Sequence, residues 1–387
     1  MPPGEHLLRS LLILLSIAVL GPMIAVRMRA PTAVVLILAG LGIGPAGLGI
    51  LRDTPTISFL SHFGFLVLMF MAGLEIDFTT IRAAGPRSLG VPSLVVVGIA
   101  ICTLLSARLL GLGPVQALAV SAMSVGLPLS TLKETGHAAT PLGRHIMLTA
   151  SLGEFAVILA ITGVELAEDG ALSLHTLIRI AKIGALFTLC ALALRFARAL
   201  VWWYPQRFRR LIDHHDVAEL GVRVGLFIML AFVAISSLAG VESILGAFLG
   251  GILLSFVLRQ KDVLEGKIAA LGNGLFIPIF FIVVGVRFDA SALDRGTAKQ
   301  AVLLALVVAA CKILPALLVA PRGMSLRGRL ATGCLLSAPL TLIVAIAAIG
   351  RSLGLIGAPQ QASLVLLAIL LSVGFPVLFR LSAPRAE

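Results

Sequence analysis

Residues 124–129 read Ser-Val-Gly-Leu-Pro-Leu, and they interrupt an apolar run that extends from Val115 to Leu132. Proline lacks a backbone donor and clashes with the preceding helical turn, so the sequence predicts a helix that is broken around Gly126 and Pro128. Within a bilayer the polar backbone groups freed by such a break must be satisfied inside the protein. The interruption therefore indicates a buried polar site.

The same interruption recurs in the second half of the chain. Residues 336–341 read Leu-Ser-Ala-Pro-Leu-Thr, so Ser337 and Pro339 predict a second broken helix, about 211 residues after the first. A lone proline often only kinks a membrane helix, but the paired positions favour a repeated site near the bilayer midplane.

A second pair of matching stretches has nearly the same offset. Residues 72–77 read Ala-Gly-Leu-Glu-Ile-Asp and residues 284–289 read Val-Gly-Val-Arg-Phe-Asp, so Gly73 matches Gly285 at a distance of about 212 residues. The offset corresponds to about seven spans, an odd number, so the second copy must cross the membrane in the opposite sense. We expect inverted repeats at approximately 33–166 and 243–381, with linking spans at 174–239.

The composition of the chain indicates a membrane protein. Of its 387 residues 59% are hydrophobic and only 12% are charged, which excludes an ordinary soluble domain. The sequence predicts one all-α polytopic membrane domain, residues 1–387, with about thirteen transmembrane helices. The expected spans are Leu7–Val26, Ala33–Leu51, Phe59–Leu74, Leu89–Leu110, Val115–Leu132, Leu142–Leu166, Leu174–Val201, Ala218–Ala239, Ser243–Leu258, Ile268–Val286, Ala298–Ala320, Gly328–Gly350 and Gln361–Leu381.

The formal charge of +12 reflects loops between spans, so no nucleic-acid partner is needed to explain it. Lys and Arg number roughly 19 on one set of alternate joints with the C-terminus and about 7 on the other. This bias predicts an external N-terminus and a cytoplasmic C-terminus in a bacterial inner membrane. The aromatic residues 202–204, directly before Arg207, mark one cytoplasmic joint.

Two charged residues lie far from any span end, and each costs about 2.5 to 3.5 kcal/mol to insert. Glu154 lies in the middle of the sixth span and Lys312 well inside the eleventh. A buried salt bridge without a transport role is one interpretation, but such pairs are weak evidence for stability. A carboxylate can hold either a dehydrated cation or a proton but not both, which suits the exchange of the two.

We therefore predict that Glu154 binds both the transported metal cation and the proton, with Lys312 as its charge partner. Hydroxyl oxygens of Ser124, Ser151 and Thr341 are candidate additional ligands beside the two breaks. For each of these hydroxyls an interhelical hydrogen bond is an equally good explanation.

These stretches resemble the cation:proton antiporter-2 family, which holds Kef-type and NapA-like exchangers of the NhaA fold. The resemblance covers essentially the whole chain and rests on residues 72–77, Thr140-Pro-Leu-Gly-Arg144, Gly246-Ala-Phe-Leu-Gly-Gly251, Phe280-Phe-Ile-Val-Val-Gly285 and Lys312. It implies two broken helices that cross beside the carboxylate, an elevator-like movement and a homodimer. It implies no cofactor beyond the transported Na+ or K+ and H+.

Two features depart from the pattern of that family. The sixth span reads Gly153-Glu154 where many members have a second acidic or amide side chain before the ion-binding carboxylate, which resembles a Gly-Glu-Phe subset. The second break lacks the acidic residue that many relatives carry. Because the chain stops at Glu387, we expect no cytoplasmic nucleotide-binding regulatory domain of the Kef type.

Two alternative functions remain open from the residues. A Na+-coupled organic anion symporter could use the same architecture, because helix N-termini at the breaks suit anions. A sensor that binds a cation without transporting it is the other alternative, suggested by Gly153. The seven His residues are scattered and no nucleophile motif or phosphate loop is present, so we expect no enzyme.

Overall fold

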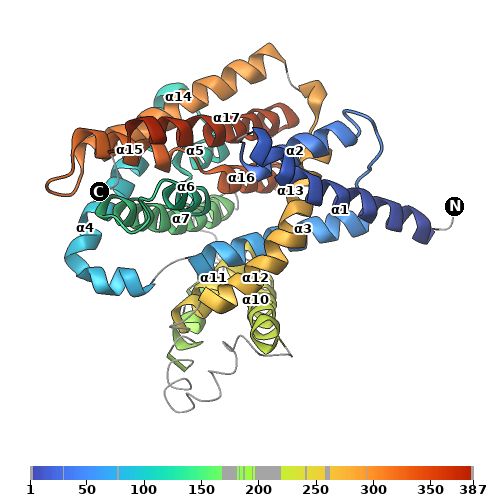
Figure 1. Ribbon diagram of the computed structural model, residues 1–387, viewed down its shortest axis with the longest axis horizontal. Helices are drawn as coiled ribbons and strands as arrows, with labels where there is room; N and C mark the ends of the chain where they lie inside the picture. The colour runs from blue at the N-terminus through green and yellow to red at the C-terminus, as the bar shows by residue number, and fades with distance from the viewer. Residues whose placement is uncertain are drawn as a thin grey trace. The chain divides into compact units, whose positions relative to one another are not determined.

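The computed structural model describes residues 3–28, 30–75, 78–167, 219–239, 242–257, 262–292 and 294–384, with a few residues between 181 and 196. Every regular element in these residues is helical (Figure 1), which confirms the all-α prediction. Ten segments are long and apolar enough to cross a membrane, and two shorter apolar helices accompany them. They match twelve of the thirteen predicted spans. The remaining span, Leu174–Val201, and the aromatic joint at 202–204 lie largely or wholly outside the described residues.

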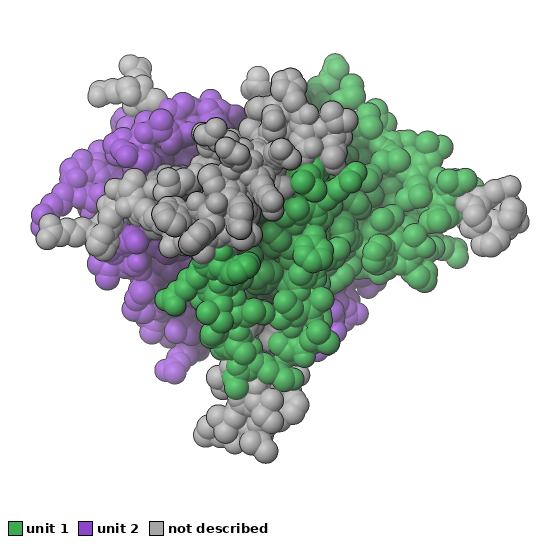
Figure 2. Space-filling model, turned by 90° about the horizontal axis from the view of Figure 1, so that it is seen from below, with its two compact units in different colours: residues 1–28, 35–80, 162–287 green, residues 29–34, 81–161, 288–387 purple. Residues whose placement is uncertain are grey.

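The chain divides into two compact units, coloured separately in Figure 2. The first comprises residues 1–28, 35–80 and 162–287. Its helices are α1 (Pro3–Met28), most of α2 (Thr32–Ile43), α3 (Pro55–Glu75), α10 (Leu220–Leu238), α11 (Ser243–Val257), α12 (Asp262–Leu271) and α13 (Ile277–Val286), the last two joined by a π-helical turn at Gly272–Phe276. Helix α2 ends before the predicted Leu51 because the glycines and proline of residues 44–49 form turns.

Helices α3 and α11 cross in the first unit at a pair of glycines. A Cβ atom on Gly73 would lie 2.2 Å from the carbonyl oxygen of Phe248, and one on Gly251 would lie 2.1 Å from that of Phe70. Small residues let the backbones of membrane helices approach this closely. Any side chain at either glycine would separate the two helices.

The crossing of α2 with α13 repeats this arrangement. A Cβ atom on Gly40 would lie 2.0 Å from the carbonyl oxygen of Ile282, and one on Gly285 would lie 2.0 Å from that of Ile37. Gly285 follows Gly73 by about 212 residues, and Gly251 follows Gly40 by about 211. The match of Gly73 with Gly285 read from the sequence thus relates two helix crossings of the same kind.

The second unit comprises residues 29–34, 81–161 and 288–387. It contains most of α4 (Phe78–Leu110) and α7 (Pro141–Ala167), together with α5 (Pro114–Ser121), α6 (Gly126–Glu134), α14 (Arg295–Leu318), α15 (Leu326–Leu336), α16 (Leu340–Ser352) and α17 (Ala358–Ser382). Helices α14, α15 and α17 pack against one another, and α16 packs against α5 and α17. The segment that holds α15 and α16 is the most deeply buried of the ten.

Both predicted helix breaks are present in this unit. Helix α5 ends at Ser121 and α6 begins at Gly126, while α15 ends at Leu336 and α16 begins at Leu340. Pro128 lies in the first turn of α6, and Pro339 directly precedes α16. The first turn of a helix has no internal partner for its N–H groups, so proline is tolerated there. The first break therefore precedes Pro128, and the second break ends at Pro339.

Polar contacts fix the far end of α6 within the second unit. Arg380 on α17 donates a 2.6 Å hydrogen bond to the carboxylate of Glu134. The ring nitrogen Nε2 of His137 lies 2.8 Å from the carbonyl oxygen of Pro384, and the ring packs edge-on against Phe379. The second half of the broken helix is thus attached to α17 at the end away from its break.

Candidate functional site

The residues 122–125 between α5 and α6 form the centre of the candidate site. Their backbone leaves the helical conformation at Ala122, where φ is −54° and ψ is 131°. Each of the four successive residues contacts another helix of the second unit: α14 at Ala122, α7 at Met123, α16 at Ser124 and α7 again at Val125. Three helices therefore hold this short segment in place.

Glu154 provides the carboxylate of the site. Its side chain on α7 is only 2% exposed, and its Oε2 atom accepts a 3.1 Å hydrogen bond from the backbone N–H of Val125. Val125 directly precedes α6, so the carboxylate faces the helix end where unpaired N–H groups give a partial positive charge. Ser151 lies on the same helix one turn earlier and is also buried.

Lys312 provides the positive charge of the site. It lies on α14 with no exposed surface, and its Nζ atom donates a hydrogen bond to the carbonyl oxygen of Ala122. Ala122 directly follows α5, whose C-terminal end carries a partial negative charge. The positive charge of Lys312 thus contacts the C-terminal end of α5, and the carboxylate of Glu154 contacts the N-terminal end of α6. The direct pairing of Lys312 with Glu154 stays a prediction.

Hydroxyl groups join the two breaks. Ser124 Oγ and Thr341 Oγ1 lie 3.1 Å apart, and Thr341 is in the first turn of α16. Ser337, at the second break, donates instead to the carbonyl oxygen of Gly333 on its own helix at 2.8 Å. The structure therefore brings together Ser124, Thr341 and, through Val125, Glu154.

Met123 is a site residue that the sequence reasoning missed. A Cβ atom on Gly153 would lie 2.0 Å from Met123 Cε and 2.6 Å from its Sδ atom, so the methionine fills the space beside Gly153. The sequence contained one signal of this contact, because Gly153 directly precedes the buried Glu154 in the middle of a helix. Its partner could not be found from sequence, because the contact joins two segments about 30 residues apart.

The oxygen donors around Glu154 suit a loosely held monovalent cation better than a resident transition metal, which prefers nitrogen and sulfur ligands. Among the residues that the structure describes, no group of three or more His, Cys, Asp or Glu side chains could hold a metal ion. One carboxylate with neutral hydroxyl and carbonyl oxygens is the chemistry available here.

The fold and the site define a polytopic membrane transporter with two interrupted helices. The family model for the transmembrane domain of sodium/hydrogen exchangers matches residues 14–381, and the chain belongs to that family. Its members are transporters and not enzymes.

Two curated relatives and one solved structure agree with this assignment. The chain is 30% identical to the "Putative Na(+)/H(+) antiporter YjbQ" of Bacillus subtilis over 98% of its own length and 63% of that protein's length. It is 27% identical to "Probable Na(+)/H(+) antiporter 3" of Methanocaldococcus jannaschii, covering 95% of this chain and 94% of that one. The structure of the sodium proton antiporter MjNhaP1 from Methanocaldococcus jannaschii has the same fold, with a TM-score of 0.64 at 14% identity over 97% of this chain and 96% of that one.

Proposed function

We propose that the protein exchanges a monovalent cation, Na+ or K+, for protons across a bacterial inner membrane. The observation that carries the proposal is the buried carboxylate of Glu154 held at the break between α5 and α6. An ionisable residue in the middle of a span is expensive to insert, and it marks an ion or proton pathway by default. The names of both curated relatives give Na+/H+ antiport as their function, which agrees with this interpretation.

Competition at Glu154 would couple the two fluxes. A dehydrated monovalent cation needs the charged carboxylate, whereas a bound proton neutralises it, so one group cannot hold both. Ser124, Thr341, Ser151 and the backbone carbonyls of the break supply neutral oxygens of the kind that replace water around a cation. No cofactor takes part, because the cation and the proton are the substrates.

Lys312 would keep the site folded when Glu154 changes charge. Its contact with the Ala122 carbonyl places a positive charge at the end of α5, and this contact does not involve the side chain of Glu154. In this proposal Lys312 is also the charge partner of the ionised carboxylate.

An elevator-like mechanism requires that the whole site move as one body. All the predicted site residues belong to the second unit: Glu154, Lys312, Ser124, Ser151, Thr341, Gly126, Pro128, Ser337 and Pro339. This distribution supports movement of the second unit as the carrier of the ion. The glycine crossings of α2, α3, α11 and α13 lie in the first unit and suit a rigid support.

The proposal also covers the oligomeric state of the protein and its orientation in the membrane. We propose a homodimer with the N-terminus outside and the C-terminus in the cytoplasm, within a single membrane domain built from the inverted repeats 33–166 and 243–381. Chemical cross-linking in native membranes tests the dimer. A fluorescent protein fused after Glu387 tests the orientation, because it fluoresces only on the cytoplasmic side.

The activity is tested in liposomes that hold the purified protein and a pH-sensitive dye. Na+, K+ and Li+ are added in turn to vesicles of wild type, Glu154→Gln and Glu134→Gln. Glu134 is a matched control because its carboxylate is exposed on α6, outside the site. We expect cation-evoked proton flux from wild type and Glu134→Gln and none from Glu154→Gln.

Other results would favour the alternatives. Absence of flux with every cation from folded wild type would overturn the proposal. Uptake of organic anions driven by Na+ would then identify a symporter. Cation binding that depends on Glu154 without any flux would identify a sensor.

A further inference from the structure

We propose that Met123 is a positioning residue, whose side chain against Gly153 holds the break between α5 and α6 so that the Val125 N–H reaches Glu154. The inference rests on the proposed function, because it assigns the residue that sets the geometry of the same site. The contact with Met123 also explains why position 153, directly before Glu154, is a glycine.

The contact of Met123 with Gly153 leaves no room for another side chain. A Cβ atom on Gly153 would lie 2.0 Å from Met123 Cε, 2.6 Å from Sδ and 3.2 Å from Cβ. Methionine is flexible and can often adapt to a new neighbour. Met123, however, is only 1% exposed, so its displaced end would have to enter space that other atoms fill. A side chain at position 153 therefore pushes the break away from α7.

The same two segments form the hydrogen bond to the carboxylate. Gly153 and Glu154 are adjacent on α7, while Met123 and Val125 are two residues apart in the break. Met123 and Val125 both contact α7, whereas Ser124 between them contacts α16. The Met123 packing contact and the Val125 hydrogen bond thus hold one segment against two adjacent residues of α7. A shift at Met123 lengthens the bond to Glu154.

This role differs from ordinary core packing in what it affects. A residue that only fills space changes the stability of the protein and the amount of folded protein. A residue that positions Val125 also changes how well the site binds its cation, because misplacement of about 1 Å in a binding geometry can cost up to two orders of magnitude. The affinity for the cation in the folded fraction is therefore the decisive readout.

Five proteins separate the two roles: wild type, Met123→Ala, Gly153→Ala, the double variant and Gly163→Ala. Gly163 is a matched control on α7, because a Cβ atom there would meet nothing within 4 Å. Each protein is reconstituted, and the apparent KM for the cation and the maximal rate are measured by proton flux. Thermal unfolding in detergent is measured on the same samples.

We expect the Met123→Ala substitution to reverse part of the effect of Gly153→Ala on the KM for the cation. Gly153→Ala raises the apparent KM by about tenfold or more. Met123→Ala raises it less, because the break loses a support without being displaced. The double variant has a lower KM than Gly153→Ala, because the new methyl group occupies space that the methionine has vacated. Gly163→Ala keeps the KM of wild type.

Two results would overturn the inference. If wild type exchanges cations and Gly153→Ala has an unchanged KM, Met123 does not position the site, even if thermal stability falls. If the double variant is no better than Gly153→Ala, the two positions do not act as a pair. Absence of exchange by wild type is a different result, because it overturns the proposed function and this inference together.

Discussion

Ser124 Oγ and Thr341 Oγ1 lie 3.1 Å apart and join the two broken helices of the second unit where both are interrupted. The two residues are about 217 positions apart in sequence, one in each predicted repeat. Ser124 precedes Val125, which donates to Glu154. The hydroxyl pair therefore connects the second break to the segment that holds the carboxylate.

A double-mutant cycle on these two hydroxyls should show coupling. We expect Ser124→Ala and Thr341→Val to destabilise the protein by about 0.5–1.5 kcal/mol each, and the second substitution to cost little once the first is made. Reversible unfolding in mild detergent measures the free energies. Ser130→Ala is a control, because that hydroxyl donates its hydrogen bond to the Leu127 carbonyl oxygen of its own helix. Strict additivity would contradict the contact.

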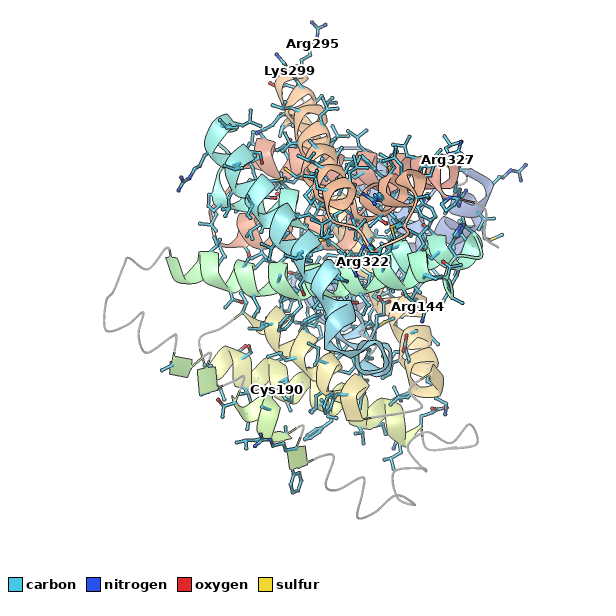
Figure 3. All side chains as sticks on the ribbon, turned by 90° about the vertical axis from the view of Figure 1, so that its left-hand side faces the viewer. Arg144, Cys190, Arg295, Lys299, Arg322 and Arg327 are labelled. Atoms are coloured by element: carbon cyan, nitrogen blue, oxygen red, sulfur yellow. The ribbon has the colours of Figure 1, made fainter. Side chains whose placement is uncertain are left out.

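Replacement of Lys312 by methionine should destabilise the protein by about 1–3 kcal/mol. The substitution leaves the Ala122 carbonyl without its donor in an apolar environment, although the relief of a buried charge offsets part of this cost. Lys299→Met is the control on the same helix, since Figure 3 shows Lys299 and Arg295 projecting from the first turns of α14. Equal thermal stability of the two variants would be inconsistent with the contact at Ala122.

An added methyl group at Gly40 should be poorly tolerated. Its Cβ atom would lie 2.0 Å from the Ile282 carbonyl oxygen, so α2 and α13 must separate, at a cost of about 1–3 kcal/mol. Gly42 lies on the same helix, and a Cβ atom there would meet nothing within 4 Å. We expect Gly40→Ala to lower the yield of folded protein and Gly42→Ala to leave it unchanged. Similar yields would argue against the close crossing.

The sequence alone predicted both breaks because proline has a strong and local effect on a helix. It placed the first break at Gly126 and Pro128, which lie in the first turn of α6, whereas Ser337 and Pro339 lie within the second break. A repeated sequence pattern matched Gly73 with Gly285, and the structure places both at close helix crossings. Features of this kind can be predicted from the sequence because each follows from a single residue type.

The contacts of the buried groups could not be predicted in the same way. The partner of Lys312 is a backbone carbonyl at Ala122, and a carbonyl carries no residue-specific signal. The neighbour of Gly153 is Met123, an ordinary apolar residue in an apolar run. Both contacts depend on the path of the chain through the break, which pairwise patterns in the sequence do not specify.

The central claim is that the cation and the proton compete for Glu154, and proton release on cation binding tests it most directly. Purified wild type and Glu154→Gln are placed in weakly buffered detergent solution across a series of pH values, and Na+ or K+ is titrated while released protons are counted. We predict that wild type releases up to one proton per cation bound and that Glu154→Gln releases none. Cation binding by wild type without proton release at any pH, or equal release by both proteins, would contradict the account.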